Sequence, residues 1–440
     1  MLGAGAPRAY REPRTTRGPG PGAPTGRWHN GTDGTTDFSN NSLTDSGKRE
    51  RMHTDWNPAA RVRDMGTSVF TEMTELARAT GAVNLGQGVP ELDSPALLLK
   101  DVAAAVLAGS NQYPPAAGFP ALREAVAEHQ RARYGLEYRP AGEVLVTTGA
   151  TEALAAALLA LCDPGDEILA FDPCYDAYPA GARLAGARLV PVPLEMSGDT
   201  FVLDPAALRA AVTPRSRVLL LNTPHNPTGK VFTAEELAAV ADVCQEHDLT
   251  VVTDEVYEHL VYGDARHHTL AALPGMRERT LTISSAGKTF NVTGWKIGWV
   301  CGPAHLVAAV GAAKQFLTYA SGTPYQEALA RMLGDVEEWA AGLRGTLCRN
   351  RDLLTEGLAR AGLRPYRADA GYFVQADVRE WGYTDGVRFC RELPSRAGVV
   401  AIPTSAFYVR PNAPSYLVRF SFCKREESVR TAMEKLLSAA

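Results

Sequence analysis

The amino-acid sequence predicts an α/β fold in which a mostly parallel central sheet is flanked by helices, together with a smaller α+β domain. The first observation is that short apolar and β-branched runs alternate with helical stretches between about residues 96 and 320. Such repetition of strand, helix and strand builds a largely parallel sheet. The second observation is a change of order after about residue 320, where a long helical stretch precedes several short strands and a last helix.

The individual elements follow from the spacing of the apolar residues. Residues 69–80 have a helical period that ends at Gly81, a residue suited to a helix C-cap. In the larger region we expect strands at 143–149, 166–173, 187–194, 216–224, 249–256 and 279–285, and helices at 150–162 and 234–248. In the smaller region we expect helical structure at 325–361, strands within 371–378, 399–407 and 416–422, and a terminal helix.

The chain of 440 residues divides into four parts. Residues 1–52 are rich in Gly, Pro, Ser, Thr, Asn and Arg and show no period, which predicts a disordered N-terminal extension. Residues 53–95 are expected to form an N-terminal arm and part of the small domain. The large, ligand-binding domain is expected at 96–320 and the small C-terminal domain at 321–440.

Composition excludes several classes of function. An apolar share of 45%, a charged share of 21% and a net charge of -4 are those of a soluble globular protein and favour neither nucleic acid nor an anionic membrane as partner. No apolar run reaches the roughly 18 to 20 residues that span a bilayer, and residues 1–30 lack the apolar centre of a secretory signal. We therefore expect a cytoplasmic protein with small-molecule partners.

Neither the cysteines nor the histidines form a recognisable metal motif. The seven cysteines are scattered, with no CxxC pair and no Cys/His cluster. His267 and His268 are adjacent, but without an acidic or cysteine companion in the sequence they are better explained as part of a solvated loop. We expect reduced thiols and no metal.

Residues that follow the predicted strands are candidates for a ligand site, because ligands of open α/β sheets bind at the carboxyl ends of the strands. The strand at 143–148 runs into Gly149, Ala150 and Thr151 and then into an alanine-rich helix. Free backbone N–H groups and the positive end of the helix favour a phosphate at this corner. A plain strand-to-helix turn explains the same glycine equally well.

Two polar side chains follow other strands. In NTPHNPTG, residues 222–229, the prolines and the closing glycine fix a rigid turn that presents the amide of Asn226. In VVTDEVY, Asp254 comes after apolar and β-branched residues, where an unpaired buried carboxylate is costly. We expect a cationic partner for Asp254, and a helix N-cap or a surface position is the alternative.

Lys288 and Lys296 follow the predicted strand at 279–285, and each taken alone is explained as a solvated surface charge. The ordered series GATEAL, PCYDAY, NTPHNPTG, TDEVY, SSAGKTFNVTGWKIGW and RFSF is far more specific. As a set it resembles the class I and II aminotransferases, which use pyridoxal 5'-phosphate (PLP) and have PLP-dependent transferase fold type I, over about residues 60–436. VNLGQGVP, NQYPPAAGFPALREA and YLVRFSFCK resemble the branch with kynurenine, methionine and N-succinyldiaminopimelate aminotransferases.

The resemblance implies the roles of the residues around the cofactor. Lys288 would form the Schiff base with PLP and then carry a proton between the substrate Cα and the cofactor C4'. Asp254 would pair with the pyridine N–H, while Tyr257 and Asn226 would bind the phenolic O3'. Tyr175 would stack on the cofactor ring. The phosphate would be held by Gly149, Ala150, Thr151, Ser285 and Lys296. Tyr113 would reach the cofactor from a neighbouring subunit, so a homodimer is expected. Many members of the family have an arginine where this chain has Lys296. The bidentate guanidinium is then replaced by the point charge of an ammonium group.

The resemblance also implies how the substrate is held. Arg419 would receive the α-carboxylate, helped by Asn226 and by the backbone of Gly88. The side chain would face Val89, Tyr113, Tyr325 and Phe407. This apolar and aromatic set suits a neutral side chain such as that of methionine, glutamine, phenylalanine or kynurenine. N-succinyl-L,L-diaminopimelate stays a candidate as well.

Two other functions are compatible with parts of the pattern. A PLP-dependent carbon-sulfur β-lyase begins with the same deprotonation at Cα. A non-catalytic aminotransferase-like regulator needs an N-terminal DNA-binding module, and residues 1–52 lack the helical pattern of one.

Overall fold

The computed structural model describes residues 57–63, 65 and 69–440. The predicted extension at 1–52 and the first residues of the predicted arm lie outside the described residues.

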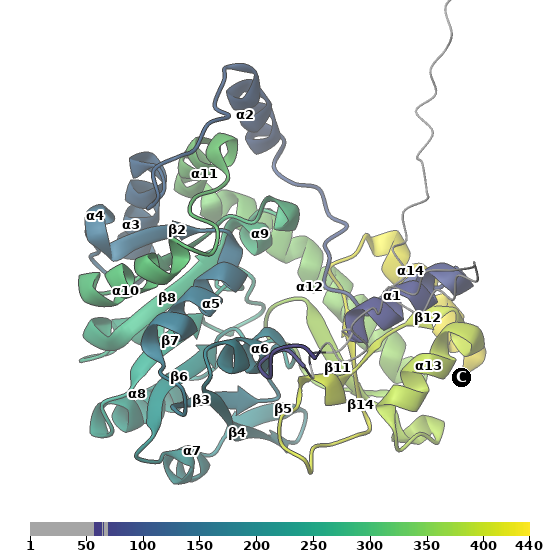
Figure 1. Ribbon diagram of the computed structural model, residues 1–440. Helices are drawn as coiled ribbons and strands as arrows, with labels where there is room; N and C mark the ends of the chain where they lie inside the picture. The colour runs from purple at the N-terminus through teal and green to yellow at the C-terminus, as the bar shows by residue number, and fades with distance from the viewer. Residues whose placement is uncertain (1–56, 64, 66–68) are drawn as a thin grey trace, which may run out of the picture. The chain divides into compact units, whose positions relative to one another are not determined.

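An eight-stranded mixed sheet forms the centre of the larger region (Figure 1). Its strands are β2 (Val144–Thr147), β3 (Glu167–Asp172), β4 (Arg188–Ser197), β5 (Thr200–Leu203), β6 (Ser216–Asn222), β7 (Thr250–Asp254), β8 (Thr280–Ser285) and β9 (Gly298–Cys301). They lie in the order β2-β9-β8-β7-β6-β3-β4-β5. β9 is antiparallel to β2 and β8, and β5 is antiparallel to β4, whereas the other neighbours pair in parallel. The parallel strands therefore end at one edge of the sheet.

Helices cover both faces of this sheet, because its strands bury alternate residues on opposite sides. In β3, Ile168 and Ala170 face the core shared with α5 (Gly149–Leu161), α6 (Ala177–Leu184) and α10 (Ala304–Lys314). Leu169 and Phe171 face the other side, where α7 (Pro205–Ala211) and α8 (Ala234–Glu246) pack. Near β2 that side is covered by α2 (Ala96–Leu107), α3 (Pro120–Tyr134) and α11 (Thr323–Gly334).

The C-terminal part contains a second, antiparallel sheet in the order β10-β11-β14-β13. Its strands are β10 (Arg364–Pro365), β11 (Phe373–Asp377), β13 (Ile402–Pro403) and β14 (Leu417–Ser421). One core joins this sheet to α1 (Val69–Thr80), α12 (Val336–Arg360), α13 (Gly386–Ala397) and α14 (Glu426–Ala439). β1 (Val83–Asn84) pairs with β12 (Val399–Val400), so the segment before residue 96 packs with the C-terminal part. We propose the domain limit near residue 96 on this basis. The limit near residue 320 stays a prediction, because α11 packs in the core of the larger region.

The α/β fold class and the helix at 69–80 are confirmed, and two details differ from the expectation. The helical stretch 325–361 is two helices, because Asp335 leaves helical geometry between α11 and α12. β5 and β9 have no counterpart among the predicted strands, nor do the two-residue strands β1 and β10. β5 and β9 have only four residues each and too few alternations to register as a pattern. The remaining α-helices, α4 (Pro140–Glu143) and α9 (Ala286–Thr289), are short.

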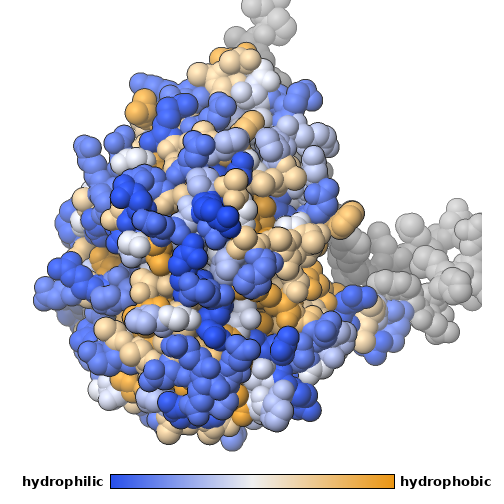
Figure 2. All heavy atoms as spheres, turned by 90° about the vertical axis from the view of Figure 1, so that its left-hand side faces the viewer, coloured by the Kyte–Doolittle hydropathy of each residue, from blue (hydrophilic) through white to orange (hydrophobic). Residues whose placement is uncertain are grey.

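Within the described residues, no helix is long and apolar enough to cross a membrane. Figure 2 shows the face that lies at the left of Figure 1, and polar side chains cover much of it. Apolar side chains also reach the surface, among them Leu97, Leu99, Val106 and Leu107 of α2.

Candidate active site

A cavity of about 490 Å³ lies where the parallel strands end. The residues that follow β2, β3, β6, β7 and β8 all contribute to it, as expected for an open α/β sheet. It brings together most of the residues predicted from the sequence: Gly88, Val89, Gly149, Ala150, Thr151, Tyr175, Asn226, Asp254, Tyr257, Ser285, Lys288, Lys296 and Arg419.

Lys288 projects into this cavity from α9, directly after β8. Its Nζ lies 5.8 Å from the ring centroid of Tyr257 and 5.4 Å from that of Tyr372. Burial lowers the pKa of Lys288, and the charges of Arg419 and Lys296 act in the same direction. The neutral amine needed for attack on a carbonyl is therefore more accessible than in a surface lysine.

Asp254 ends β7 and is only 4% exposed. Burial raises its pKa to about 6, although hydrogen bonds oppose that shift. Oδ2 accepts a hydrogen bond of 2.7 Å from the hydroxyl of Tyr178, and Oδ1 has a longer contact of 3.4 Å with the backbone N–H of Val256. Within the chain Oδ2 is thus held by a tyrosine hydroxyl, and the cationic partner of Asp254 stays a prediction. Oδ1 retains capacity for a stronger donor.

Arg419 lies on β14 and is 1% exposed. Its Nη1 donates to Asn226 Oδ1 at 2.9 Å and its Nη2 to the Gly86 carbonyl at 3.2 Å. Nε has no hydrogen-bond partner among the described residues. Burial lowers the pKa of Arg419 to about 10, so the guanidinium remains charged at neutral pH. A buried cation with a donor to spare is suited to a carboxylate.

The guanidinium of Arg419 is held in place by aromatic rings. Its central carbon lies 3.7 Å from the ring centroid of Phe373 and 4.4 Å from that of Phe407. Phe70 is the third ring, at 5.4 Å. This stacking restricts the arginine plane, which favours bidentate recognition.

Asn226 is oriented by two contacts of the rigid turn after β6. Its backbone N–H donates to Asn222 Oδ1 at 2.7 Å, and its side-chain oxygen accepts from Arg419. Because a guanidinium can only donate, the amide oxygen of Asn226 must face it. The NH₂ group is then left to act as a donor in the cavity.

The corner between β2 and α5 has the features of an anion site. Gly149 has φ +73°, a conformation that favours glycine, and opens α5. Lys296 Nζ lies 3.4 Å from Thr151 Oγ1. A Cβ at Gly298 would lie 2.7 Å from the carbonyl carbon of Gly149 and 2.8 Å from the nitrogen of Ala150, so β9 approaches this corner closely only because residue 298 is glycine.

Three residues predicted for the site do not line this cavity. Tyr113 is 80% exposed and packs edge-on against Tyr319, with ring centroids 5.6 Å apart. Tyr325 stacks on Trp295 at 4.6 Å instead of facing the cavity. Phe407 is buried behind Arg419 and acts there as packing. Tyr325 and Phe407 therefore lie outside this cavity, and their contact with the substrate side chain stays a prediction.

The sequence reasoning missed other residues that line the cavity. Tyr178 lies three residues after Tyr175 in PCYDAY, and that helical spacing is a usable signal. Phe373 opens β11, whose Gln375 pairs with Arg419, but nothing local in the sequence shows that pairing. Phe70 reaches the cavity from α1, and no sequence signal indicates it.

This arrangement of sheet and cavity is that of the aspartate aminotransferase fold. The chain belongs to the class I and II aminotransferases, whose family model matches residues 80–436. It is thus an enzyme of the aminotransferase type, as predicted.

Three similar proteins define the branch. The structure of N-succinyldiaminopimelate aminotransferase from Mycobacterium tuberculosis is 50% identical, with a TM-score of 0.86, and the match covers 87% of this chain and 100% of that one. Methionine aminotransferase of Escherichia coli is 38% identical, over 86% of this chain and 97% of that protein. Kynurenine–oxoglutarate transaminase 3 of Mus musculus is 38% identical, over 86% of this chain and 89% of that protein. The branch predicted from the sequence is confirmed, and all three are named as aminotransferases.

Proposed function

We propose that this enzyme binds PLP in the cavity beside Lys288 and transfers the amino group of an L-amino acid to a 2-oxo acid. The observation that carries the proposal is the setting of Lys288, a lysine of lowered pKa in a cavity that also contains a buried carboxylate and a buried arginine with an unused donor. Lysines that serve only solubility are exposed.

The residues present fit the cofactor. The cavity is suited to a planar group whose ring nitrogen would meet Asp254 Oδ1, because that oxygen lacks a strong donor. The N–H groups of the first turn of α5, with Lys296 and Ser285, suit a phosphate. Tyr175, which lines the cavity, would stack on the ring.

When bound, PLP supplies an electron sink for the charge left on Cα once its proton is removed. Lys288 Nζ would hold the cofactor and then carry the Cα proton, for which a lowered pKa is required. Burial raises the pKa of Tyr257, so its hydroxyl stays protonated and would donate, with the NH₂ of Asn226, to the cofactor O3'. Asp254 would keep the ring nitrogen protonated.

Arg419 would set the orientation of the substrate. Its unused N–H donors, together with the backbone N–H of Gly88 at the mouth, would bind the α-carboxylate. A Cβ at Gly88 would lie 2.5 Å from the Phe373 ring, so only glycine fits between substrate and ring there. The carboxylate then turns the Cα–H bond toward Lys288.

For the donor we propose a neutral, aromatic or sulfur-containing amino acid, namely methionine, glutamine, phenylalanine or kynurenine, or else N-succinyl-L,L-diaminopimelate. The half-exposed Val89 at the mouth leaves room for a long side chain. The relative with 50% identity is named for N-succinyldiaminopimelate, whereas those at 38% are named for methionine and kynurenine. These names support the same set of candidates.

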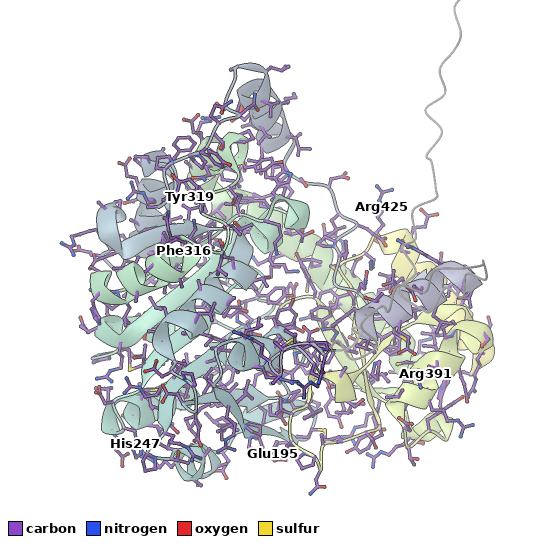
Figure 3. The ribbon with its side chains drawn as sticks, in the orientation of Figure 1. Glu195, His247, Phe316, Tyr319, Arg391 and Arg425 are labelled. Carbon is purple, nitrogen blue, oxygen red and sulfur yellow. The ribbon has the colours of Figure 1, made fainter. Side chains whose placement is uncertain are left out.

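We also propose a homodimer in which Tyr113 reaches the phosphate site of the partner. Tyr113 contacts Tyr319, and the preceding Thr318 is hydrogen-bonded to Thr148, just before α5. Phe316, in the same loop, is 90% exposed, and Figure 3 labels it together with Tyr319. Exposed apolar side chains of this loop and of α2 suit an interface. As the composition indicates, we expect this dimer to work in the cytoplasm with small molecules alone.

The test is a panel of amino donors mixed with the PLP-loaded enzyme, followed by its visible absorbance, with 2-oxo acids added afterwards. A donor should abolish the absorbance of the bound cofactor, and an oxo acid should restore it. The panel includes methionine, glutamine, phenylalanine, kynurenine and N-succinyl-L,L-diaminopimelate. Release of pyruvate and ammonia from cystathionine would instead indicate the β-lyase, and no response to any donor would indicate the regulator.

A further inference from the structure

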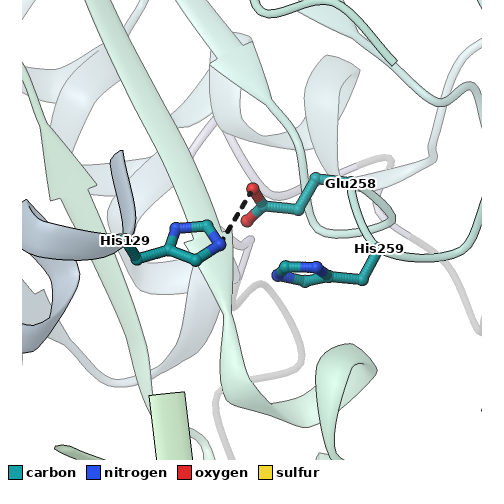
Figure 4. Close-up of side chains that lie close together, drawn as sticks. All are labelled: His129, Glu258 and His259. Atoms are coloured by element: carbon teal, nitrogen blue, oxygen red, sulfur yellow. Dashed lines mark ion pairs between the residues drawn. The ribbon is translucent and has the colours of Figure 1, made fainter. Parts of the chain in front are cut away.

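A second group of polar side chains lies outside the active site, between α3 and the turn after β7. It consists of His129 of α3 and of Glu258 and His259 of the turn (Figure 4). We propose that these three residues bind a divalent cation of the borderline class, such as Zn²⁺. The proposal does not depend on the reaction that the enzyme catalyses.

The ligand atoms are close enough for one ion. Taking one atom from each side chain, all three lie within 4.8 Å of one another. His129 Nε2 is 3.9 Å from Glu258 Oε2, too far for a direct hydrogen bond. A metal with bonds of about 2.0 to 2.2 Å to imidazole nitrogen and carboxylate oxygen fits between atoms at such separations after small side-chain shifts.

Both histidines are buried, and their ring nitrogens have no hydrogen-bond partners among the described residues. The side chain of His129 is 4% exposed and that of His259 is 1% exposed. Neither Nδ1 nor Nε2 of either ring forms a hydrogen bond there. Two adjacent imidazoles with unused nitrogens are costly in a protein interior, and a shared metal ion would lower that cost by binding one nitrogen of each ring.

Outer contacts already orient these side chains. The Glu258 carboxylate accepts hydrogen bonds of 2.6 Å from Tyr134 and 2.6 Å from Ser284. Glu337 Oε1 lies 3.4 Å from His259 Nδ1. Carboxylates and hydroxyls in these positions are typical of the second layer around a protein-bound metal.

The three buried side chains lie beside a cavity, and the charges around them are compatible with a cation. Glu258 and His259 line a cavity of about 610 Å³ that also contains Glu337, so an ion and a fourth, water ligand have a route in. The nearby Arg133 is paired with Glu337, as is Arg344 at 3.5 Å. Two histidines and one carboxylate with an open position form a set typical of Zn²⁺.

The consequence is a link between α3 and the turn that contains Tyr257, directly before Glu258. A bound ion would therefore stabilise the segment that follows Asp254. Sequence reasoning missed this group because His129 is far from Glu258 and His259 in the chain, and neither segment has metal-ligand spacing.

The test uses the full-length, PLP-loaded enzyme without a histidine tag, treated with a chelator and titrated with Zn²⁺ against a chromophoric chelator. We expect one equivalent of Zn²⁺ to bind and to raise the thermal midpoint. His129→Gln and His259→Gln should each weaken binding at least about tenfold, the lower end of what changes around metal sites cost. The matched controls His268→Gln, at the exposed rim of the same cavity, and His247→Gln, on the surface near the end of α8, should bind as the unchanged enzyme does.

The proposal is overturned if the enzyme binds no stoichiometric Zn²⁺, or if both ligand variants fold and bind it with unchanged affinity. If the ligand variants fail to fold, crystals of the unchanged enzyme soaked in Zn²⁺ decide. Anomalous density at the zinc edge between His129, Glu258 and His259 supports the site, and its absence there refutes it.

Discussion

Replacing Arg419 by lysine keeps the charge but removes the planar fork. In the native enzyme Nη1 and Nη2 each use one N–H group on Asn226 and Gly86, and the other N–H donors of the guanidinium are left for the substrate. A lysine ammonium has its three donors on one atom. It therefore cannot donate to Asn226, the Gly86 carbonyl and the substrate carboxylate at once. We therefore expect Arg419→Lys to fold but to bind the α-carboxylate poorly.

The size of the loss follows from the contact that disappears. One hydrogen bond to a charged group contributes about 1.5 to 3 kcal/mol. At 1.36 kcal/mol per factor of ten, that predicts a decrease of about 10- to 150-fold in kcat/KM. The contact of Asn226 Oδ1 is weakened too, so the upper part of this range is the better expectation.

The assay is the half-reaction of the PLP-loaded enzyme with an amino donor, followed by stopped-flow absorbance. Arg391→Lys is the matched control, because Arg391 lies on the surface of α13 in an ion pair with Glu72 and should show unchanged rates (Figure 3). The same variants are compared with a primary amine that lacks a carboxylate, for which Arg419→Lys should cost little. An equal loss for both kinds of donor, or no loss for amino acids, would refute the assignment of Arg419.

Four further predictions concern the cofactor side of the cavity. Tyr178→Phe removes the hydrogen bond that lowers the pKa of Asp254, so the affinity for PLP should fall about 5- to 150-fold, equivalent to about 1 to 3 kcal/mol, in an equilibrium titration of the apoenzyme. Because burial lowers the pKa of Lys288, the rate at which the apoenzyme reacts with PLP should rise with pH and reach half its maximum below the usual lysine value of about 10.4. Asp254→Asn should move that midpoint lower still, since the carboxylate raises the pKa of Lys288, and an upward shift would contradict this. Gly298→Ala should lower the thermal midpoint because its Cβ would lie within 2.8 Å of backbone atoms, whereas Gly294→Ala, with nothing within 4 Å, should leave it nearly unchanged.

Much of the site was predictable because its residues follow strands whose pattern is local. Asp254 and Ser285 each end a short apolar run, and parallel strands bring such ends to one edge of the sheet. The hydrogen bond between Tyr178 and Asp254 was not predictable, since it joins side chains 76 residues apart. The stacking of Tyr325 on Trp295 was not predictable either, because the sequence around Tyr325 does not reveal this contact.

Two features of the fold, β9 and the break between α11 and α12, were not predictable from the local spacing of apolar residues. β9 has four residues inside a glycine-rich motif, so its antiparallel insertion between β2 and β8 left no periodic trace. The break between α11 and α12 at Asp335 is equally hard to see, because helical residues flank it on both sides.

The most direct test of the account is to locate the lysine that holds the cofactor. The PLP-loaded enzyme is reduced with borohydride, digested and mapped by mass spectrometry. We expect one pyridoxyl group per chain, on Lys288, and none on Lys296, which would only contact the phosphate. A modified lysine elsewhere, or no stable modification, would contradict the central claim.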